Sequence, residues 1–189
     1  SDVDAITPVI EKIAVYFGGN DILVNNAVVG AGVPIEDEVY LSVWDRADSI
    51  MLAAHVHTIG ASLPYIRKSI HGRIVNIASM EGLGATKNIS AYTLVKSGVI
   101  GLTRSLAVKL GREAITVNCI CPVPIRTGMT ADTLDEHKEI FAKRRVPLDR
   151  YAEPEEVTHG TLSLVLPPSE YITGVELQVN GGLTIKMPD

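Results

Sequence analysis

The stretch Arg73-Ile74-Val75-Asn76-Ile77-Ala78-Ser79 is a short apolar run that ends in small and polar residues. Its β-branched composition predicts a buried β-strand that ends near Ser79. The same pattern occurs upstream in Asp21-Ile22-Leu23-Val24, which is followed by Asn25-Asn26, and downstream in Ile115-Thr116-Val117-Asn118-Cys119-Ile120. Continuous apolar strands of this kind are typical of a parallel sheet that is covered on both faces.

Segments with helical periodicity separate these strands. Apolar residues at positions 6, 9, 10, 13 and 17 predict a helix that ends at Gly18-Gly19, and residues 43–66 and 92–110 predict two longer helices. Pro154-Glu155-Glu156 is typical of a helix start, and residues 175–179 predict a last strand. We therefore expect one α/β domain over residues 1–189, a parallel sheet between two helical layers, with residues 127–147 as its most irregular part.

Composition and charge exclude several classes of protein. The 189 residues carry a net charge of -5, with 46% hydrophobic and 21% charged residues, which disfavours a disordered chain and a nucleic-acid-binding surface. No apolar run is long enough to span a membrane, and the opening Ser-Asp-Val-Asp lacks the basic and apolar parts of a signal peptide. We therefore expect a cytoplasmic protein without a nucleic-acid or membrane partner.

The cysteine and histidine positions argue against a metal site. Cys119 and Cys121 lie two apart in an apolar stretch, so we interpret them as buried thiols rather than a disulfide or metal ligands. His55 and His57 are also two apart, and on a helix such a pair points in different directions and cannot share a metal ion.

The chemistry is expected where the parallel strands end, because ligands of such sheets bind at their carboxyl ends. Ser79 follows one strand end, and Tyr92 and Lys96 lie four apart on the next predicted helix, so both side chains project from one face. A lysine ammonium beside a tyrosine favours the ionised phenol, and a serine hydroxyl can hold a substrate oxygen in line with the moving proton. This set suits proton transfer coupled to hydride transfer at a carbonyl or alcohol carbon.

Several motifs occur together in a fixed order: Asn25-Asn26-Ala27, the 74–79 stretch, Ala91-Tyr92-Thr93-Leu94-Val95-Lys96-Ser97-Gly98, and Val117-Asn118-Cys119-Ile120-Cys121-Pro122. In this order they resemble the short-chain dehydrogenase/reductase family, and the resemblance runs from about Val9 to Ile185. It implies a doubly wound Rossmann fold with three αβα layers, and an oxidoreductase that uses NAD or NADP to interconvert a secondary alcohol and a ketone.

The resemblance also implies roles for individual residues. Tyr92 would be the general acid/base, Lys96 would lower its pKa and hold the nicotinamide ribose, and Ser79 would orient the substrate oxygen. The residues that it places along the cofactor are Asn26, Ala27, Tyr92, Lys96, Pro122, Val123, Ile125 and Thr127. For Thr127, a helix-capping or turn hydroxyl is the structural alternative. The pocket for a small carbonyl or alcohol substrate is expected to be lined by Val28, Val29, Met80, Gly82, Pro124 and residues 127–147.

The sequence departs from the family pattern at three places. No glycine-rich turn for a pyrophosphate precedes Ile6, so we expect the natural protein to carry roughly sixty further residues, or a partner chain, ahead of the given sequence, because the sheet would otherwise expose a long apolar edge. Met51, seven residues after Trp44, stands where relatives place an asparagine of the proton relay. Val28 and Val123 replace usual glycines and would crowd the nicotinamide.

These departures leave other functions open. A non-catalytic scaffold or binding subunit on the same fold is one alternative, and the intact Ser79, Tyr92 and Lys96 set argues against it. A dehalogenase of this fold would carry arginine at position 96, and an enoyl reductase would space its tyrosine and lysine further apart. The resemblance further implies a homodimer or homotetramer, and small residues on the two long helices permit close helix packing.

Overall fold

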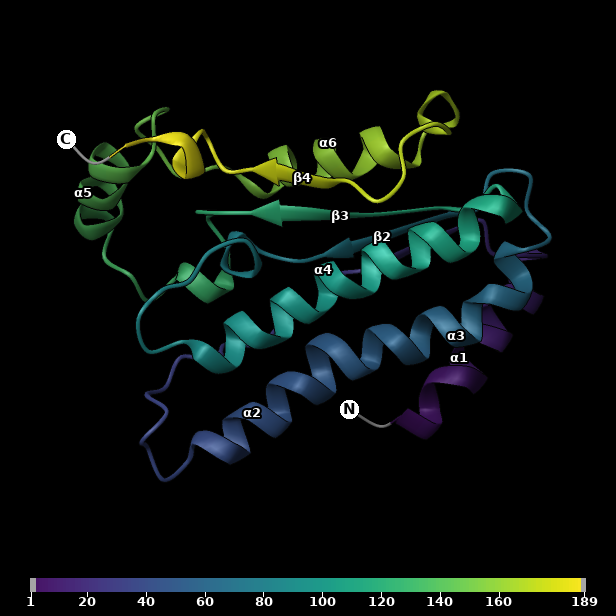
Figure 1. Ribbon diagram of the computed structural model, residues 1–189, viewed down its shortest axis with the longest axis horizontal. Coiled ribbons are helices and arrows are strands. Elements are labelled where there is room, and N and C mark those ends of the chain that lie inside the picture. The colour runs from purple at the N-terminus through teal and green to yellow at the C-terminus, as the bar shows by residue number, and fades with distance from the viewer. Residues whose placement is uncertain (1–2, 188–189) are drawn as a thin grey trace.

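Four strands form one parallel sheet in the computed structural model, which describes residues 3–187 (Figure 1). The sheet order follows the chain: β1 (Ile22–Asn25), β2 (Arg73–Ile77), β3 (Thr116–Pro122) and β4 (Glu176–Val179). Leu23 pairs with Ile74, and Val75 pairs with Asn118, so the carboxyl ends of the strands meet at one edge. The strands predicted from sequence are confirmed to within two residues at either end.

Helices cover both faces of this sheet and confirm the doubly wound α/β fold. On one face lie α1 (Val3–Phe17), α2 (Tyr40–Asp48), α3 (Ala54–Ile66) and α4 (Ser90–Leu110), and α6 (Pro154–Val165) packs on the other (Figure 1). The apolar faces of the strands are buried against them. The core beneath α3 and α4 includes Ile59, Ile66, Ile74, Leu110 and Val117, and the core beneath α6 includes Val75, Ile120 and Leu164.

The long helix predicted over residues 43–66 contains an interruption. A π-helical turn, Ser49–Ala53, joins α2 to α3, and the Ala54 amide donates to the Ser49 carbonyl, five residues back. Such a turn accommodates one extra residue in a helix and is frequent at functional sites. It places Met51 fully inside the protein.

The segment predicted to be irregular, residues 127–147, instead contains α5 (Asp135–Arg145). This expectation was wrong because the helix is almost entirely polar, and Lys138 and Ala142 are its buried residues. Without an apolar stripe the helical period is not visible in the sequence. Acidic residues in the first turn and basic residues in the last one stabilise it through the helix dipole.

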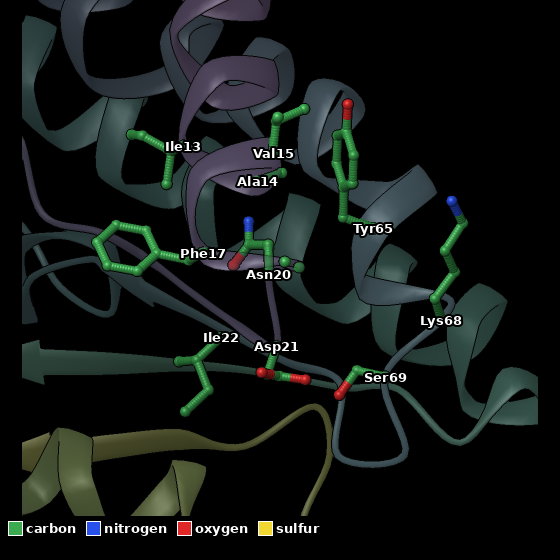
Figure 2. A pocket seen from close by; sticks show the side chains of 12 residues that line it. Ile13, Ala14, Val15, Phe17, Asn20, Asp21, Ile22, Tyr65, Lys68 and Ser69 are labelled. Carbon is green, nitrogen blue, oxygen red and sulfur yellow. The ribbon is translucent and has the colours of Figure 1, made fainter.

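The outer edge of β1 is apolar and open to solvent, as the sequence led us to expect. Ile22 and Val24 are 44% and 42% exposed, and Tyr16 and Phe17 at the end of α1 are about four-fifths exposed. A cavity of about 600 Å³ lies between this end of α1 and the end of α3, with Tyr65 on its wall (Figure 2). Within the described residues no helix combines the length and the apolar character needed to cross a bilayer.

Candidate active site

A cleft of about 1000 Å³ opens at the carboxyl ends of β1, β2 and β3. It brings together most of the side chains that the sequence singled out. The lining includes Asn26, Ser79, Tyr92, Lys96, Pro122, Val123, Ile125 and Thr127. Ala27 is exposed and is not part of the lining.

Ser79 is positioned by the turn that follows β2. Its backbone is extended, and its hydroxyl accepts a 3.1 Å hydrogen bond from the Glu81 amide at the start of a short 3₁₀ turn, Met80–Gly82. This cap fixes the serine at the cleft floor, where it is 6% exposed. The Tyr92 side chain, on the first turn of α4, lines the same cleft as Ser79, whose side chain lowers the pKa of the phenol by hydrogen bonding.

Lys96 lies one helical turn after Tyr92 and is 1% exposed. Its Nζ donates a 2.8 Å hydrogen bond to the Ile77 carbonyl at the end of β2 and lies 5.6 Å from the centre of the Tyr92 ring. Burial lowers the pKa of Lys96 to about 8. The lysine is therefore held at the strand end beside the tyrosine, as the four-residue spacing predicts.

The electrostatic effect on Tyr92 differs from the expectation. We expected Lys96 to lower the pKa of the phenol, whereas the pKa of Tyr92 is raised, chiefly by burial, with the Ser79 hydrogen bond acting in the opposite direction. Burial favours the uncharged phenol, and the lysine donates to a carbonyl rather than to the phenol oxygen. Tyr92 is thus held in the protonated form that a proton donor needs.

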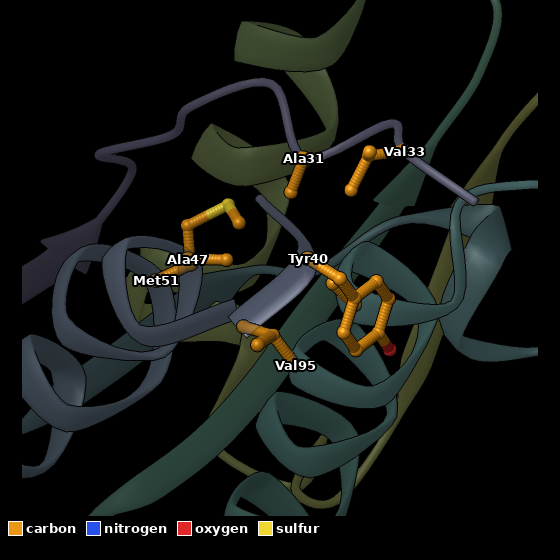
Figure 3. Packing of buried hydrophobic residues seen from close by; sticks show 7 residues of the cluster. Ala31, Val33, Tyr40, Ala47, Met51 and Val95 are labelled. Carbon is orange, nitrogen blue, oxygen red and sulfur yellow. The ribbon is translucent and has the colours of Figure 1, made fainter. Parts of the chain in front are cut away.

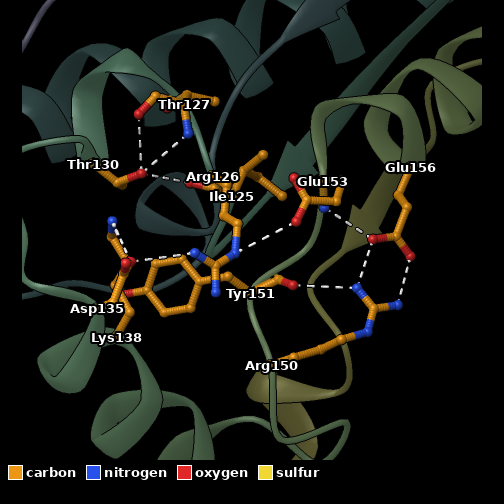
Figure 4. A network of polar contacts seen from close by, with 10 residues as sticks. All are labelled: Ile125, Arg126, Thr127, Thr130, Asp135, Lys138, Arg150, Tyr151, Glu153 and Glu156. Atoms are coloured by element: carbon orange, nitrogen blue, oxygen red, sulfur yellow. Dashed lines mark hydrogen bonds and ion pairs between the residues drawn. The ribbon is translucent and has the colours of Figure 1, made fainter.

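The segment after β3 forms the apolar wall of the cleft. The Val123 amide bonds to the Val179 carbonyl, and Ile125 pairs with Ala152, so this wall is tied to neighbouring backbone. Arg126 beside it contacts Asp135 and Glu153, both at 3.4 Å (Figure 4). The wall is therefore linked to the starts of α5 and α6.

Thr127 also caps a short turn. Its side chain and that of Thr130 form a reciprocal capping box at the turn Gly128–Thr130 (Figure 4). Thr127 therefore has the turn-capping role that the sequence left open as its alternative, and it also lines the cleft. Val28 and Pro124 line the cleft as expected, whereas Val29, Met80 and Gly82 do not belong to its lining.

Met51 is buried in a cluster that includes Ala31, Ala47 and Val95 (Figure 3). Its sulfur accepts a 3.5 Å contact from the Val29 amide, just beyond the end of β1. A thioether is a weak acceptor, so Met51 offers little hydrogen-bonding capacity to the cleft.

Sequence reasoning missed a buried polar chain under the strand ends. Thr58 donates to the Asn25 side chain at 2.7 Å, Asn25 donates to Asn76 at 2.9 Å, and Asn76 donates to Thr103 at 3.0 Å. The sequence contained a signal for this chain of hydrogen bonds, because an asparagine within an apolar strand must be hydrogen-bonded when it is buried. Cys119 and Cys121 are free, buried thiols as predicted, and the described residues contain no cluster of metal-ligating side chains.

Residues 1–184 match a protein-family model described as "Enoyl-(Acyl carrier protein) reductase". Together with the cleft that contains Ser79, Tyr92 and Lys96, this match identifies the family. The chain belongs to the short-chain dehydrogenase/reductase family. Its sheet, flanking helices and strand-end cleft are the Rossmann fold of that family.

Curated relatives of this short-chain dehydrogenase/reductase are reductases and dehydrogenases. It is 35% identical over 188 residues to 3-oxoacyl-[acyl-carrier-protein] reductase FabG of Thermotoga maritima, covering 98% of this chain and 74% of the relative. It is 34% identical over 191 residues to D-beta-hydroxybutyrate dehydrogenase of Rhizobium meliloti, covering 95% and 73%.

Solved structures show the same arrangement of elements. The ligand-free aldohexose dehydrogenase of Thermoplasma acidophilum superimposes with a TM-score of 0.93 at 29% identity, covering all of this chain and 77% of that one. A blue fluorescent protein from a metagenomic library, solved in complex with NADPH, has a TM-score of 0.88 at 32% identity, covering 96% and 72%.

Proposed function

We propose that this chain is an NAD- or NADP-dependent oxidoreductase that interconverts a secondary alcohol and a ketone. The observation that carries the proposal is that one cleft at the carboxyl ends of the strands is lined by Ser79, Tyr92 and Lys96, with the Lys96 Nζ 5.6 Å from the centre of the Tyr92 ring. A hydroxyl pair next to a buried cation is suited to an oxygen that gains or loses a proton.

The protein's own contribution is proton transfer and positioning. In the reductive direction, the Tyr92 phenol gives its proton to the carbonyl oxygen, while the Ser79 hydroxyl holds that oxygen in place. The Lys96 ammonium, 5.6 Å from the centre of the Tyr92 ring, then stabilises the negative charge of the phenolate. The bound nicotinamide would supply the hydride in this direction and accept it in reverse.

The cleft fits the nicotinamide end of such a cofactor. Pro122, Val123 and Ile125 offer an apolar wall for a flat ring, and Asn26, Lys96 and Tyr92 supply polar groups for a ribose on the facing side. In the same placement Thr127 lies at the end of this wall, and Ala27 follows Asn26 on the rim. These residues would hold the cofactor.

The substrate is proposed to be a small molecule with a hydrocarbon body. The free surface of the cleft is mainly apolar, with Val28, Pro124 and Met129 among its lining residues. The relatives named above include a 3-oxoacyl reductase and a hydroxybutyrate dehydrogenase, and both names describe a CH-OH/C=O pair. We therefore favour this reaction over enoyl reduction, since the spacing of Tyr92 and Lys96 is also that of carbonyl reductases in the resemblance.

The deciding experiment is Tyr92→Phe, which removes the proton donor and keeps the ring. We expect kcat for reduction of acetoacetyl-CoA or for oxidation of 2,3-butanediol to fall by about 10²-fold or more, with NADPH or NADH binding retained. Tyr65→Phe, on the far side of α3, is the matched control and should leave turnover unchanged. Undiminished turnover in Tyr92→Phe would refute the assignment, and cofactor binding without turnover in the unaltered chain would favour a scaffold.

We further propose that the protein self-associates as a homodimer or homotetramer through α4. Leu94 and Val108 on its outer side are 51% and 84% exposed, and Gly101 between them leaves room for a close helix approach. Light scattering should show an assembly that Val108→Glu converts to a smaller species.

A cytoplasmic location stays a prediction.

A further inference from the structure

Glu81 is an acidic residue in the mainly apolar cleft, and the proton transfer described above does not use it. It lines the cleft together with Ser79, and it is 9% exposed. Its Oε1 atom accepts a 2.7 Å hydrogen bond from the Thr86 hydroxyl. Its Oε2 atom is buried and has no hydrogen-bond partner among the described residues, whose ion pairs do not include Glu81. A buried carboxyl oxygen without a partner is costly, so in a cleft it indicates an acceptor for a ligand.

The turn after β2 holds Glu81 close to Ser79. The Glu81 amide donates to the Ser79 hydroxyl at 3.1 Å, and the Gly82 amide donates to the Ser79 carbonyl at 3.0 Å. A glutamate carboxyl oxygen lies at most about 6 Å from its own amide nitrogen, so Oε2 lies within about 9 Å of the Ser79 hydroxyl oxygen. One small substrate can therefore contact both side chains.

The unpaired oxygen requires a hydrogen-bond donor on the ligand. An ionised carboxyl group only accepts hydrogen bonds, so Oε2 can bind an O–H or N–H group but not a carbonyl oxygen. The terminal torsion of a glutamate is broad, so a modest rotation turns Oε2 toward the cleft while Thr86 still donates to Oε1. Two hydrogen bonds of about 2.8 Å and the roughly 3 Å between the oxygens of a vicinal diol add up to about 9 Å, which matches the largest separation from Ser79.

We propose that Glu81 is a specificity-determining residue that binds a second hydroxyl group of the substrate, on the carbon next to the reacting one. The inference rests on the proposed function, in which Ser79 holds the reacting oxygen. It narrows the substrate class to vicinal diols and α-hydroxy ketones with a short hydrocarbon body. In the oxidation of such a diol, the reacting carbon gives its hydride to NAD or NADP and its hydroxyl gives its proton to Tyr92. The second hydroxyl is unchanged, so Glu81 binds it in both directions.

The kinetic test compares 2,3-butanediol with 2-butanol, which lacks only the second hydroxyl. We expect kcat/KM of the unaltered chain for the diol to exceed that for 2-butanol by about 10- to 100-fold, because 2-butanol leaves Oε2 unpaired. Glu81→Met, which removes both carboxyl oxygens, should abolish this preference and change kcat/KM for 2-butanol by less than about twofold. Glu81→Gln, which keeps an oxygen for Thr86, should weaken the preference in a chain that folds normally.

Two further comparisons make the kinetic test specific. Glu36→Gln changes an exposed glutamate outside the cleft lining and should leave the preference for the diol intact. A preference for 3-amino-2-butanol over the diol would overturn the hydroxyl assignment, since an ammonium group would then be the donor. Equal kcat/KM values for the diol and 2-butanol in the unaltered chain would overturn the role of Glu81 and leave the proposed oxidoreductase function standing.

A binding measurement separates the two proposals when turnover is absent. In Tyr92→Phe with NAD or NADP present, addition of 2,3-butanediol should shift the ¹³Cδ resonance of Glu81, and addition of 2-butanol should not. An unmoved resonance at saturating diol would overturn the inference. A diol-dependent shift in a chain that oxidises neither alcohol would support the binding role of Glu81 and refute the proposed function.

Discussion

Gly82 packs directly on the backbone of Lys96. A Cβ added at Gly82 would lie 2.8 Å from the Lys96 carbonyl oxygen, and the Ser97 hydroxyl donates to the Gly82 carbonyl at 3.3 Å. The turn that begins at Ser79 is therefore seated on the helix that carries Tyr92 and Lys96. This contact sets the distance between the serine and the tyrosine.

Gly82→Ala should therefore destabilise the protein and impair the site. The new methyl group would meet backbone that cannot move freely, which costs about 1–3 kcal/mol in a well-packed region. Gly84→Ala is a matched control two residues away, because the nearest atom to its Cβ would be 4.0 Å distant. Urea unfolding should separate the two variants, and equal stability would contradict this view of the turn.

Lys96 should make stability depend on pH in the alkaline range. Its pKa falls from 10.5 in the unfolded chain to about 8 in the fold, so between these values the unfolded chain binds more protons. The free energy of unfolding should thus rise with pH from about 8 to 10.5, by up to about 3 kcal/mol from this group. Urea unfolding of Lys96→Met, measured over the same pH range as the unaltered chain, should lack that rise. If the free energies of unfolding of both proteins change with pH in the same way, the lysine is not desolvated in the fold.

Tyr92 should give the two reaction directions opposite pH dependences. Burial raises the pKa of the phenol and keeps it protonated through neutral pH. Ketone reduction needs the protonated form, so its rate should hold through neutral pH and decline only at alkaline pH. Alcohol oxidation needs the ionised form, so its rate should increase with pH over the same range. Initial rates measured in both directions test this, and rates that rise together with pH would argue against Tyr92 as the shared acid and base.

Val28 and Val123 should weaken cofactor binding through their branched side chains. Both line the cleft together with Asn26, and Val28 is about half exposed. We expect Val28→Gly and Val123→Gly to tighten NADH or NADPH binding by about tenfold, which corresponds to ~1.4 kcal/mol of relieved crowding. Fluorescence titration with NADH or NADPH measures the Kd of each variant, and Val39→Gly, at an exposed position outside the cleft lining, is the control. Weaker binding in both variants would show that the valines support the cofactor.

Strong, local patterns in the sequence predicted most of the framework. The strands and the shared face of Tyr92 and Lys96 follow from residue periodicity, and Pro154 marks the start of α6 as expected. Features set by three-dimensional surroundings were not predictable in this way. The helix α5 lacks an apolar stripe, and the pKa of Tyr92 depends on how deeply the ring is buried. His55 was considered only as half of an unsuitable metal pair, although the fold buries it almost completely.

The π-helical turn also determines which changes in chain length the protein can tolerate. Because the turn absorbs one extra residue, deleting one residue within Ser49–Ala53 would convert it to an ordinary α-helical turn and leave α2 and α3 in nearly the same relative orientation. Deleting one residue from the middle of α2 would instead rotate the preceding part of α2 by about 100° relative to α3. Tyr40, whose hydroxyl bonds to Ser90 at 2.9 Å at the start of α4, would then point away from its partner. The π-helical turn is therefore the place in this long helix where the loss of one residue would disturb the fold least.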